Sequence, residues 1–149
     1  STEVKEQLNK SFIMVQDTLY RDSKINLRFS GSTCVSVLIV GTKVFCANVG
    51  DQERPRAPSW IERVETRHPP EQDHKADEPD EEARILRNGG RVQPYRDIHG
   101  NQLGPLRVWH LKEDIPGLAM TRSFGDQAAA QVGVIASPEI LEMNLMEGD

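Results

Sequence analysis

Residues 118–126 are Leu-Ala-Met-Thr-Arg-Ser-Phe-Gly-Asp. A short apolar run leads into Thr-Arg-Ser, and a glycine then precedes the acid. Because glycine permits a sharp bend that residues with a Cβ resist, we expect Asp126 to end a buried segment with its carboxylate pointing into a cleft. An Asp after a Gly is also a common turn residue, so this motif alone is weak. It gains weight beside residues 46–51, Cys-Ala-Asn-Val-Gly-Asp, which have the same design.

The second motif ends a predicted β-hairpin. Residues 33–40 and 43–49 are mostly apolar, and Gly41-Thr42 between them suits a two-residue type II′ turn, which prefers glycine first. Both faces of this hairpin are apolar, whereas a hairpin with one solvent-exposed face would alternate apolar and polar residues. We therefore expect other elements to cover it on both sides.

The hairpin register also decides the state of the two cysteines. With a two-residue turn, Cys34 lies opposite Val49 and Cys46 lies opposite Val37, so the two thiols face opposite sides of the sheet. We expect no disulfide between them, which fits a reducing compartment, and two small buried apolar side chains.

The other elements follow from apolar periodicity and from Gly and Pro positions. An apolar stripe predicts a helix over 2–22, formed by Val4, Leu8, Phe12, Val15 and Leu19. Further along, we expect a loop at 52–58, an edge strand at 60–67, short strands at 91–95 and 107–111, a polar turn at 97–101, a loop through Pro116-Gly117, a helical turn at 128–130, and strands at 132–136 and 140–145.

The acidic stretch 71–82 has two interpretations. With His68 and His74 nearby, it could form a metal site. The simpler interpretation is a helix that begins at Pro79, where acidic residues in the first turn complement the positive end of the helix dipole. Residues 88–90, Asn-Gly-Gly, are a common helix end. We favour the helix.

Composition narrows the class of protein. The 149 residues suggest one domain, and 37% hydrophobic with 28% charged residues indicates a globular chain. The net charge of −5 argues against nucleic acid as the main partner, and no apolar run approaches the roughly 20 residues of a membrane helix. The N-terminus lacks the apolar region of a signal peptide. We expect an intracellular protein, cytoplasmic or nuclear.

Several of these segments, in this order, resemble the metal-dependent Ser/Thr protein phosphatases of type 2C, the PPM family. The matching segments are Ser30-Gly31-Ser32-Thr33, Ala47-Asn48-Val49-Gly50-Asp51, residues 73–81 with Gly89-Gly90-Arg91-Val92, residues 116–126 and residues 133–140. The resemblance implies an α+β fold, part of a β-sandwich of antiparallel sheets flanked by helices. It also implies hydrolysis of phosphoserine and phosphothreonine in a phosphoprotein substrate, through a dinuclear Mn²⁺ or Mg²⁺ centre whose bridging water attacks phosphorus.

The family's principal metal-ligand segments do not occur in this sequence. Asp-Gly-His-Gly, the late Ser-Asp-Gly and the final Asp-Asn pair are all absent. The resemblance therefore implies that residues 1–149 are a single partial domain, the central segment of a catalytic domain, and that this chain alone is inactive. A pseudophosphatase that serves as a protein-interaction module is the alternative. Missing outer strands would also leave sheet edges exposed, which predicts self-association.

Few site residues transfer by resemblance, and no catalytic residue is among them. Asp126 matches an Asp that contributes to a third, weaker metal site in some family members, although it could equally be a turn residue. Asp51 matches an Asp for which we expect a structural role. Arg122 matches a position that suits either a substrate contact or a buried carboxylate partner. Asp126 is thus the one predicted metal ligand.

Overall fold

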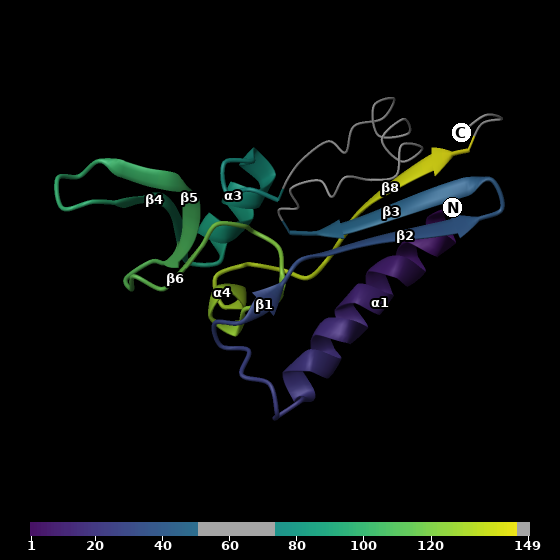
Figure 1. Ribbon diagram of the computed structural model, residues 1–149, viewed down its shortest axis with the longest axis horizontal. Coiled ribbons are helices and arrows are strands. Elements are labelled where there is room, and N and C mark those ends of the chain that lie inside the picture. Colours follow the sequence, from purple (N-terminus) through teal and green to yellow (C-terminus); the bar gives the residue numbers. More distant parts are fainter. Residues whose placement is uncertain (51–73, 146–149) are drawn as a thin grey trace.

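The computed structural model describes residues 1–50 and 74–145. Figure 1 shows two groups of elements joined by a central junction. One group is α1 (Thr2–Arg21) with β2 (Cys34–Val40), β3 (Lys43–Val49) and β8 (Glu139–Asn144). The other is α3 (Pro79–Arg87) with β4 (Gly90–Arg96), β5 (Gln102–His110) and β6 (Pro116–Leu118). Between them lie β1 (Gly31–Ser32), β7 (Phe124–Gly125) and the single turn α4 (Gln127–Ala130).

All three sheets are antiparallel, which confirms the mixed helix and antiparallel-sheet class. Their strand orders are β2-β3-β8, β4-β5-β6 and β1-β7. The predicted hairpin is confirmed, with Cys34 opposite Val49 and the turn at Gly41, whose φ is 62°. No disulfide joins Cys34 to Cys46.

The helix α1 covers one face of the β2-β3-β8 sheet (Figure 1). Phe12 of α1 is buried, and it packs in one cluster with Ala47, Val49, Phe124 and Ala136. The rings of Phe12 and Phe124 stack, with centroids 5.5 Å apart. This contact joins the hairpin to the segment that the sequence singled out.

Two expectations about this group were wrong in part. Val15, placed in the apolar stripe, is largely exposed, and Gln16 lies closer to the junction instead. The second face of the hairpin is only partly covered: Val44 on β3 is buried, but Val37 and Ile39 on β2 are about half exposed. The reason is position, since β2 is an outer strand of its described sheet.

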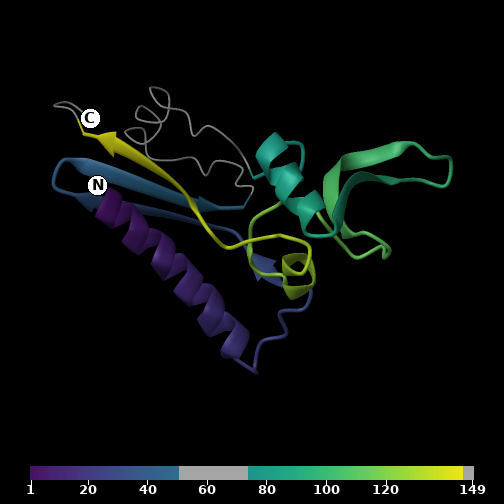
Figure 2. The ribbon, with the colours of Figure 1, turned by 180° about the vertical axis from the view of Figure 1, so that it is seen from behind.

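The second group has its own core. Ile85 from α3 and Val108 from β5 are fully buried, and Val132 and Val134 pack with them in the same cluster. Seen from behind, the β4–β5 hairpin extends away from α3 (Figure 2). The helix α3 begins at Pro79 and ends before Gly89, whose φ is 78°, so the predicted start and end are confirmed.

Residues 132–136 are not the predicted strand. Val132 N–H donates to the Ala129 carbonyl, and Gly133 adopts a φ of 96°, so the chain turns there. Ile135 alone forms a bridge, parallel to Arg122. The expected loop at Pro116-Gly117 instead belongs to β6, which pairs with β5.

Some predictions lie outside the described residues. These are the loop at 52–58, the strand at 60–67, His68 and Asp51. No described helix has the length and apolarity needed to cross a membrane.

Candidate functional site

The Gly-Asp bend at the end of residues 118–126 is sharp, as predicted. Gly125 has a φ of 77° and Asp126 a φ of 40°, so two successive residues are left-handed. Such a conformation is costly for a residue with a Cβ, and Asp is among the few that tolerate it. Asp126 is only 9% exposed, and its N–H donates to the Ser30 carbonyl at 2.8 Å. The bend therefore sits in the junction between the two groups.

Glycine at position 31 makes room for the Asp126 carboxylate. A Cβ on Gly31 would lie 1.9 Å from Asp126 Oδ2, far inside van der Waals contact. The carboxylate is thus packed against the backbone of β1, which pairs with β7 through Gly31 and Gly125. Gly31 and Asp126 both lie in segments that match the family pattern, but the sequence did not indicate that they are in contact.

Two side chains of the helix α1 also form hydrogen bonds with this bend. Gln16 Oε1 accepts from the Gly125 N–H at 2.9 Å, and the Tyr20 hydroxyl donates to the Gly125 carbonyl at 3.0 Å. Burial and the nearby Asp126 charge raise the pKa of Tyr20. Burial also raises the pKa of Asp126, and the Ser123 hydroxyl partly offsets this. Sequence reasoning missed Gln16 and Tyr20, because a polar residue on a helix carries no sign of a partner about 100 positions away.

A buried carboxylate, Glu81, lies at the centre of a second cluster. Arg84 donates to both of its oxygens at 2.7 and 2.6 Å, and Arg122 Nη2 donates to Oε1 at 2.8 Å. The Thr121 hydroxyl also donates to Glu81. Although burial acts most strongly and raises it, these hydrogen bonds together lower the pKa of Glu81 to about 2.

This cluster decides between the two interpretations of Arg122. Its guanidinium is the partner of a buried carboxylate, and its Nη1 donates to the Ser137 carbonyl at 3.0 Å. Arg84 extends the cluster, because it also donates to the carbonyls of Thr121 and Gly133. Glu81 was expected only to complement the helix dipole. It does more, since it links α3 to Thr121 and Arg122.

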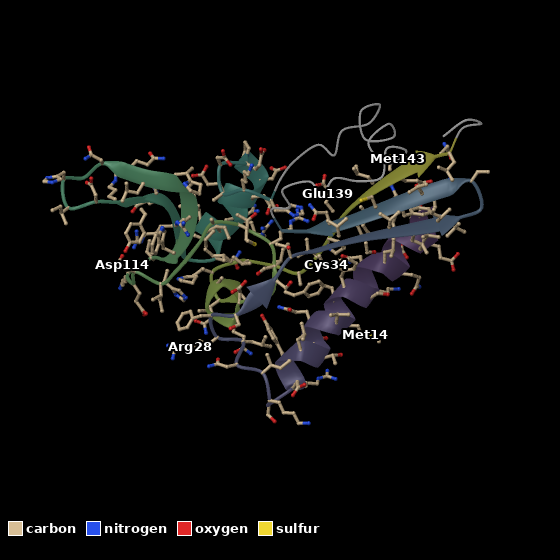
Figure 3. The ribbon with its side chains drawn as sticks, viewed as in Figure 1. Met14, Arg28, Cys34, Asp114, Glu139 and Met143 are labelled. Atoms are coloured by element: carbon tan, nitrogen blue, oxygen red, sulfur yellow. The ribbon has the colours of Figure 1, made fainter. Side chains whose placement is uncertain are left out.

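His74 is buried beside this cluster. Its Nδ1 lies 3.0 Å from the Gly50 amide nitrogen and 3.1 Å from the Gly50 carbonyl oxygen. Its Nε2 lies 3.6 Å from an Oε2 of Glu139, at the start of β8 (Figure 3). Burial, followed by the Arg122 charge, lowers the pKa of His74 to about 4. The imidazole is therefore neutral near pH 7.

The residues that the sequence suggested for metal binding do not gather in the described structure. Within residues 1–50 and 74–145, no three His, Cys, Asp or Glu side chains are placed to hold one ion. The suggested partner of His74, His68, lies outside these ranges. Metal binding by Asp126 stays a prediction.

Comparisons with known proteins all lead to one family. The family model for protein phosphatase 2C matches residues 1–149. "Probable protein phosphatase 2C 12" of Oryza sativa subsp. japonica is 32% identical over 99% of this chain and 37% of its own length. "Probable protein phosphatase 2C 73" of Arabidopsis thaliana is 30% identical over 97% of this chain and 38% of its own length. The chain thus spans well under half of these relatives.

Solved structures share the fold. The crystal structure of a serine-threonine phosphatase 2C from Toxoplasma gondii superposes with a TM-score of 0.70 at 18% identity, over 96% of this chain and 46% of that one. A C. elegans sex determining protein superposes with a TM-score of 0.65 at 19% identity, over 97% and 31% respectively. The chain belongs to the protein phosphatase 2C family.

Proposed function

We propose that residues 1–149 are the central segment of a protein phosphatase domain that removes phosphate from phosphoserine and phosphothreonine. The observation that carries the proposal is family membership along the whole chain, at 30% identity or more to curated relatives. The cofactor of the complete domain is a pair of Mn²⁺ or Mg²⁺ ions. Such a pair supplies an acidic bound water and neutralises charge on the phosphate.

The described residues do not fit that pair of ions. Two hard cations need several oxygen ligands that converge, whereas Asp126 is a single carboxylate packed against Gly31. The described residues therefore cannot hold the two ions by themselves. We propose that they hold the scaffold of the site and that this chain alone does not turn over substrate.

Activity measurements test this division of roles. Purified residues 1–149 are incubated with p-nitrophenyl phosphate and Mn²⁺, beside a longer chain of the same protein that contains the flanking sequence. We expect turnover only by the longer chain. Mn²⁺-dependent turnover by the 149 residues would refute the proposal that they are inactive alone. A longer chain that binds phosphoprotein without turnover would favour an interaction module.

We propose Asp126 as a weak, secondary metal position. Its carboxylate has the oxygen donor that Mn²⁺ and Mg²⁺ prefer. Paramagnetic broadening of amide signals by Mn²⁺ tests this without any activity. Signals of residues 30–32 and 124–128 should broaden in the unmodified chain and not in Asp126→Asn. Equal broadening in both chains would rule out the carboxylate as ligand.

Two further expectations stay proposals. Self-association through β2 is supported by its outer position in the sheet that the described residues form, and by Val37 and Ile39, which are 43% and 51% exposed. Size-exclusion chromatography with light scattering tests it, and a monomer at all concentrations would count against it. An intracellular location, cytoplasmic or nuclear, awaits imaging of the tagged protein.

A further inference from the structure

The helix α3 ends at the one asparagine of the chain that a glycine follows. The six asparagines are at positions 9, 26, 48, 88, 101 and 144, and the residues after them are Lys, Leu, Val, Gly, Gln and Leu. A backbone amide nitrogen can attack the side-chain carbonyl carbon of the asparagine before it, and glycine has no Cβ to obstruct this approach. The sequence therefore offers one favourable pair for this reaction, Asn88 and Gly89.

The pair lies at an open place on the surface. Asn88 and Gly89 are both exposed to solvent. A Cβ built on Gly89 would meet no other atom within 4 Å beyond its chain neighbours. There is consequently room beside the Gly89 backbone for a five-membered ring to form, and water reaches both residues.

In the folded structure the two reacting groups are held apart. Asn88 Nδ2 donates to the Arg84 carbonyl at 2.8 Å, and Gly89 N–H donates to the Leu86 carbonyl at 3.2 Å. Asn88 has a ψ of 14°, which turns the Gly89 nitrogen away from the Asn88 Cβ. The reaction therefore needs the last turn of α3 to open, and helix ends open more readily than helix interiors.

Asn88 also packs closely against the turn at Gly133. A Cβ on Gly133 would lie 3.1 Å from both Cβ and Nδ2 of Asn88, and 3.3 Å from the Arg84 carbonyl oxygen. Arg84 Nε donates to the Gly133 carbonyl at 2.9 Å, and the same guanidinium binds Glu81. A chemical change at Asn88 is thus in direct contact with the residues that join α3 to the Gly133 turn.

We propose that Asn88 is a site of spontaneous deamidation, and that its conversion loosens the end of α3 from the turn at Gly133. The Gly89 nitrogen attacks Cγ of Asn88 and forms an N–C bond. The Cγ–Nδ2 bond breaks, and ammonia leaves with the proton of the Gly89 nitrogen. Water then opens the resulting succinimide at either carbonyl. The products are aspartate, or isoaspartate, in which the main chain runs through the former side-chain carbonyl.

Either product disturbs the contacts that Asn88 makes. An ionised carboxylate has no proton to donate to the Arg84 carbonyl, so the hydrogen bond from Asn88 Nδ2 is lost. The new negative charge also lies at the C-terminal end of α3, where the helix dipole is negative. Isoaspartate adds a methylene to the backbone at the position that faces Gly133. We therefore expect the last turn of α3 and the Gly133 turn to open more often.

Mass spectrometry of the digested protein tests the reaction itself. Residues 1–149 are incubated at mildly alkaline pH, both folded in buffer and unfolded in guanidinium chloride, and conversion at each asparagine is followed over time. We expect Asn88 to convert before the other five, and faster in the unfolded chain than in the folded one. Asn101 is the internal control, because it is also exposed and also donates through its Nδ2, but Gln102 follows it.

Amide hydrogen exchange tests the consequence, because the N–H groups of residues 132–134 are hydrogen-bonded in the turn. Asn88→Asp should exchange faster than the unmodified chain at residues 84–90 and 132–134. Arg87→Gln is the matched control, since it changes the net charge equally at an exposed position of the same helix turn and should leave residues 132–134 unchanged. Far-UV circular dichroism establishes that each variant is folded.

Three results would overturn the proposal. The first is conversion of Asn88 in the folded chain that is no faster than conversion of Asn101. The second is equal conversion of Asn88 in the folded and unfolded chains, which would contradict the protection by the last turn of α3. The third is unchanged exchange at residues 132–134 in Asn88→Asp.

Discussion

Replacing Glu81 by Gln should strongly destabilise the fold. The carboxylate is buried and accepts hydrogen bonds from Arg84, Arg122 and Thr121. The amide of Gln has no charge and one acceptor oxygen fewer, so two guanidinium groups in the junction lose their counter-charge. Breaking a buried pair costs about 3–5 kcal/mol in the free energy of unfolding. Because both arginine side chains are nearly one-fifth exposed, we expect a value near the lower end, about 3 kcal/mol.

Urea unfolding followed by circular dichroism measures this loss. A small domain loses about 1–3 kcal/mol of stability per molar urea, so the midpoint should fall by about 1–3 M. The matched control is Asp80→Asn, one residue earlier in α3 and exposed, which changes the same charge near the helix start. It should cost no more than about 1 kcal/mol.

The pH dependence of stability distinguishes the loss of the buried Glu81 ion pair from the loss of a charge that only complements the helix dipole. The folded-state pKa of Glu81 is depressed, so its contribution is present above the unfolded-state pKa and is lost as the pH falls through about 2. Glu81→Gln should lack that acid-dependent loss. Equal urea midpoints for Glu81→Gln and Asp80→Asn would refute the central role of Glu81 in the junction.

Three further outcomes follow from the junction. Gly31→Ala should cost about 1–3 kcal/mol or more in thermal or urea unfolding, because the new Cβ would collide with the Asp126 carboxylate; an unchanged midpoint would contradict the close approach. Tyr20→Phe should cost about 1 kcal/mol through loss of the hydrogen bond to the Gly125 carbonyl, and stability equal to the unmodified chain would exclude that bond. His74 has a folded-state pKa lowered to about 4, so stability should fall as the pH drops from about 6.5 toward 4, whereas His74→Asn should lack this decline between those pH values.

The local elements could be predicted because their causes are local. The turn at Gly41 between two apolar runs specifies the hairpin, and Pro79 with Gly89 specifies both ends of α3. Each depends on residues within a few positions of one another. The strand predicted for residues 132–136 does not form, because the structure of this segment depends on contacts with distant residues. Its apolar residues fit a strand pattern, but Val132 and Val134 pack in one cluster with Ile85 of α3 on either side of a turn at Gly133, and that contact is not visible locally.

The junction could not be predicted, because its contacts join distant positions. Glu81 and Arg122 are 41 positions apart, and Gln16 and Gly125 are 109 apart. A buried Glu and an exposed Glu look alike in a sequence, and the first turn of α3 offered a simpler explanation for the acid. The packing of Asp126 on Gly31 is equally hidden, since it depends on pairing between β1 and β7.

The role of residues 118–126 follows from where each successive side chain is held. Thr121 and Arg122 bind Glu81 of α3, and Phe124 stacks on Phe12 of α1. Gly125 is held by Gln16, and the final Asp126 packs on β1. One short stretch therefore contacts elements of both groups, so we expect substitutions of these residues to destabilise the fold. That is why a stretch with no demonstrated catalytic group can identify the family: its residue types are set by the fold, and the reacting groups need only be attached to the scaffold that it holds.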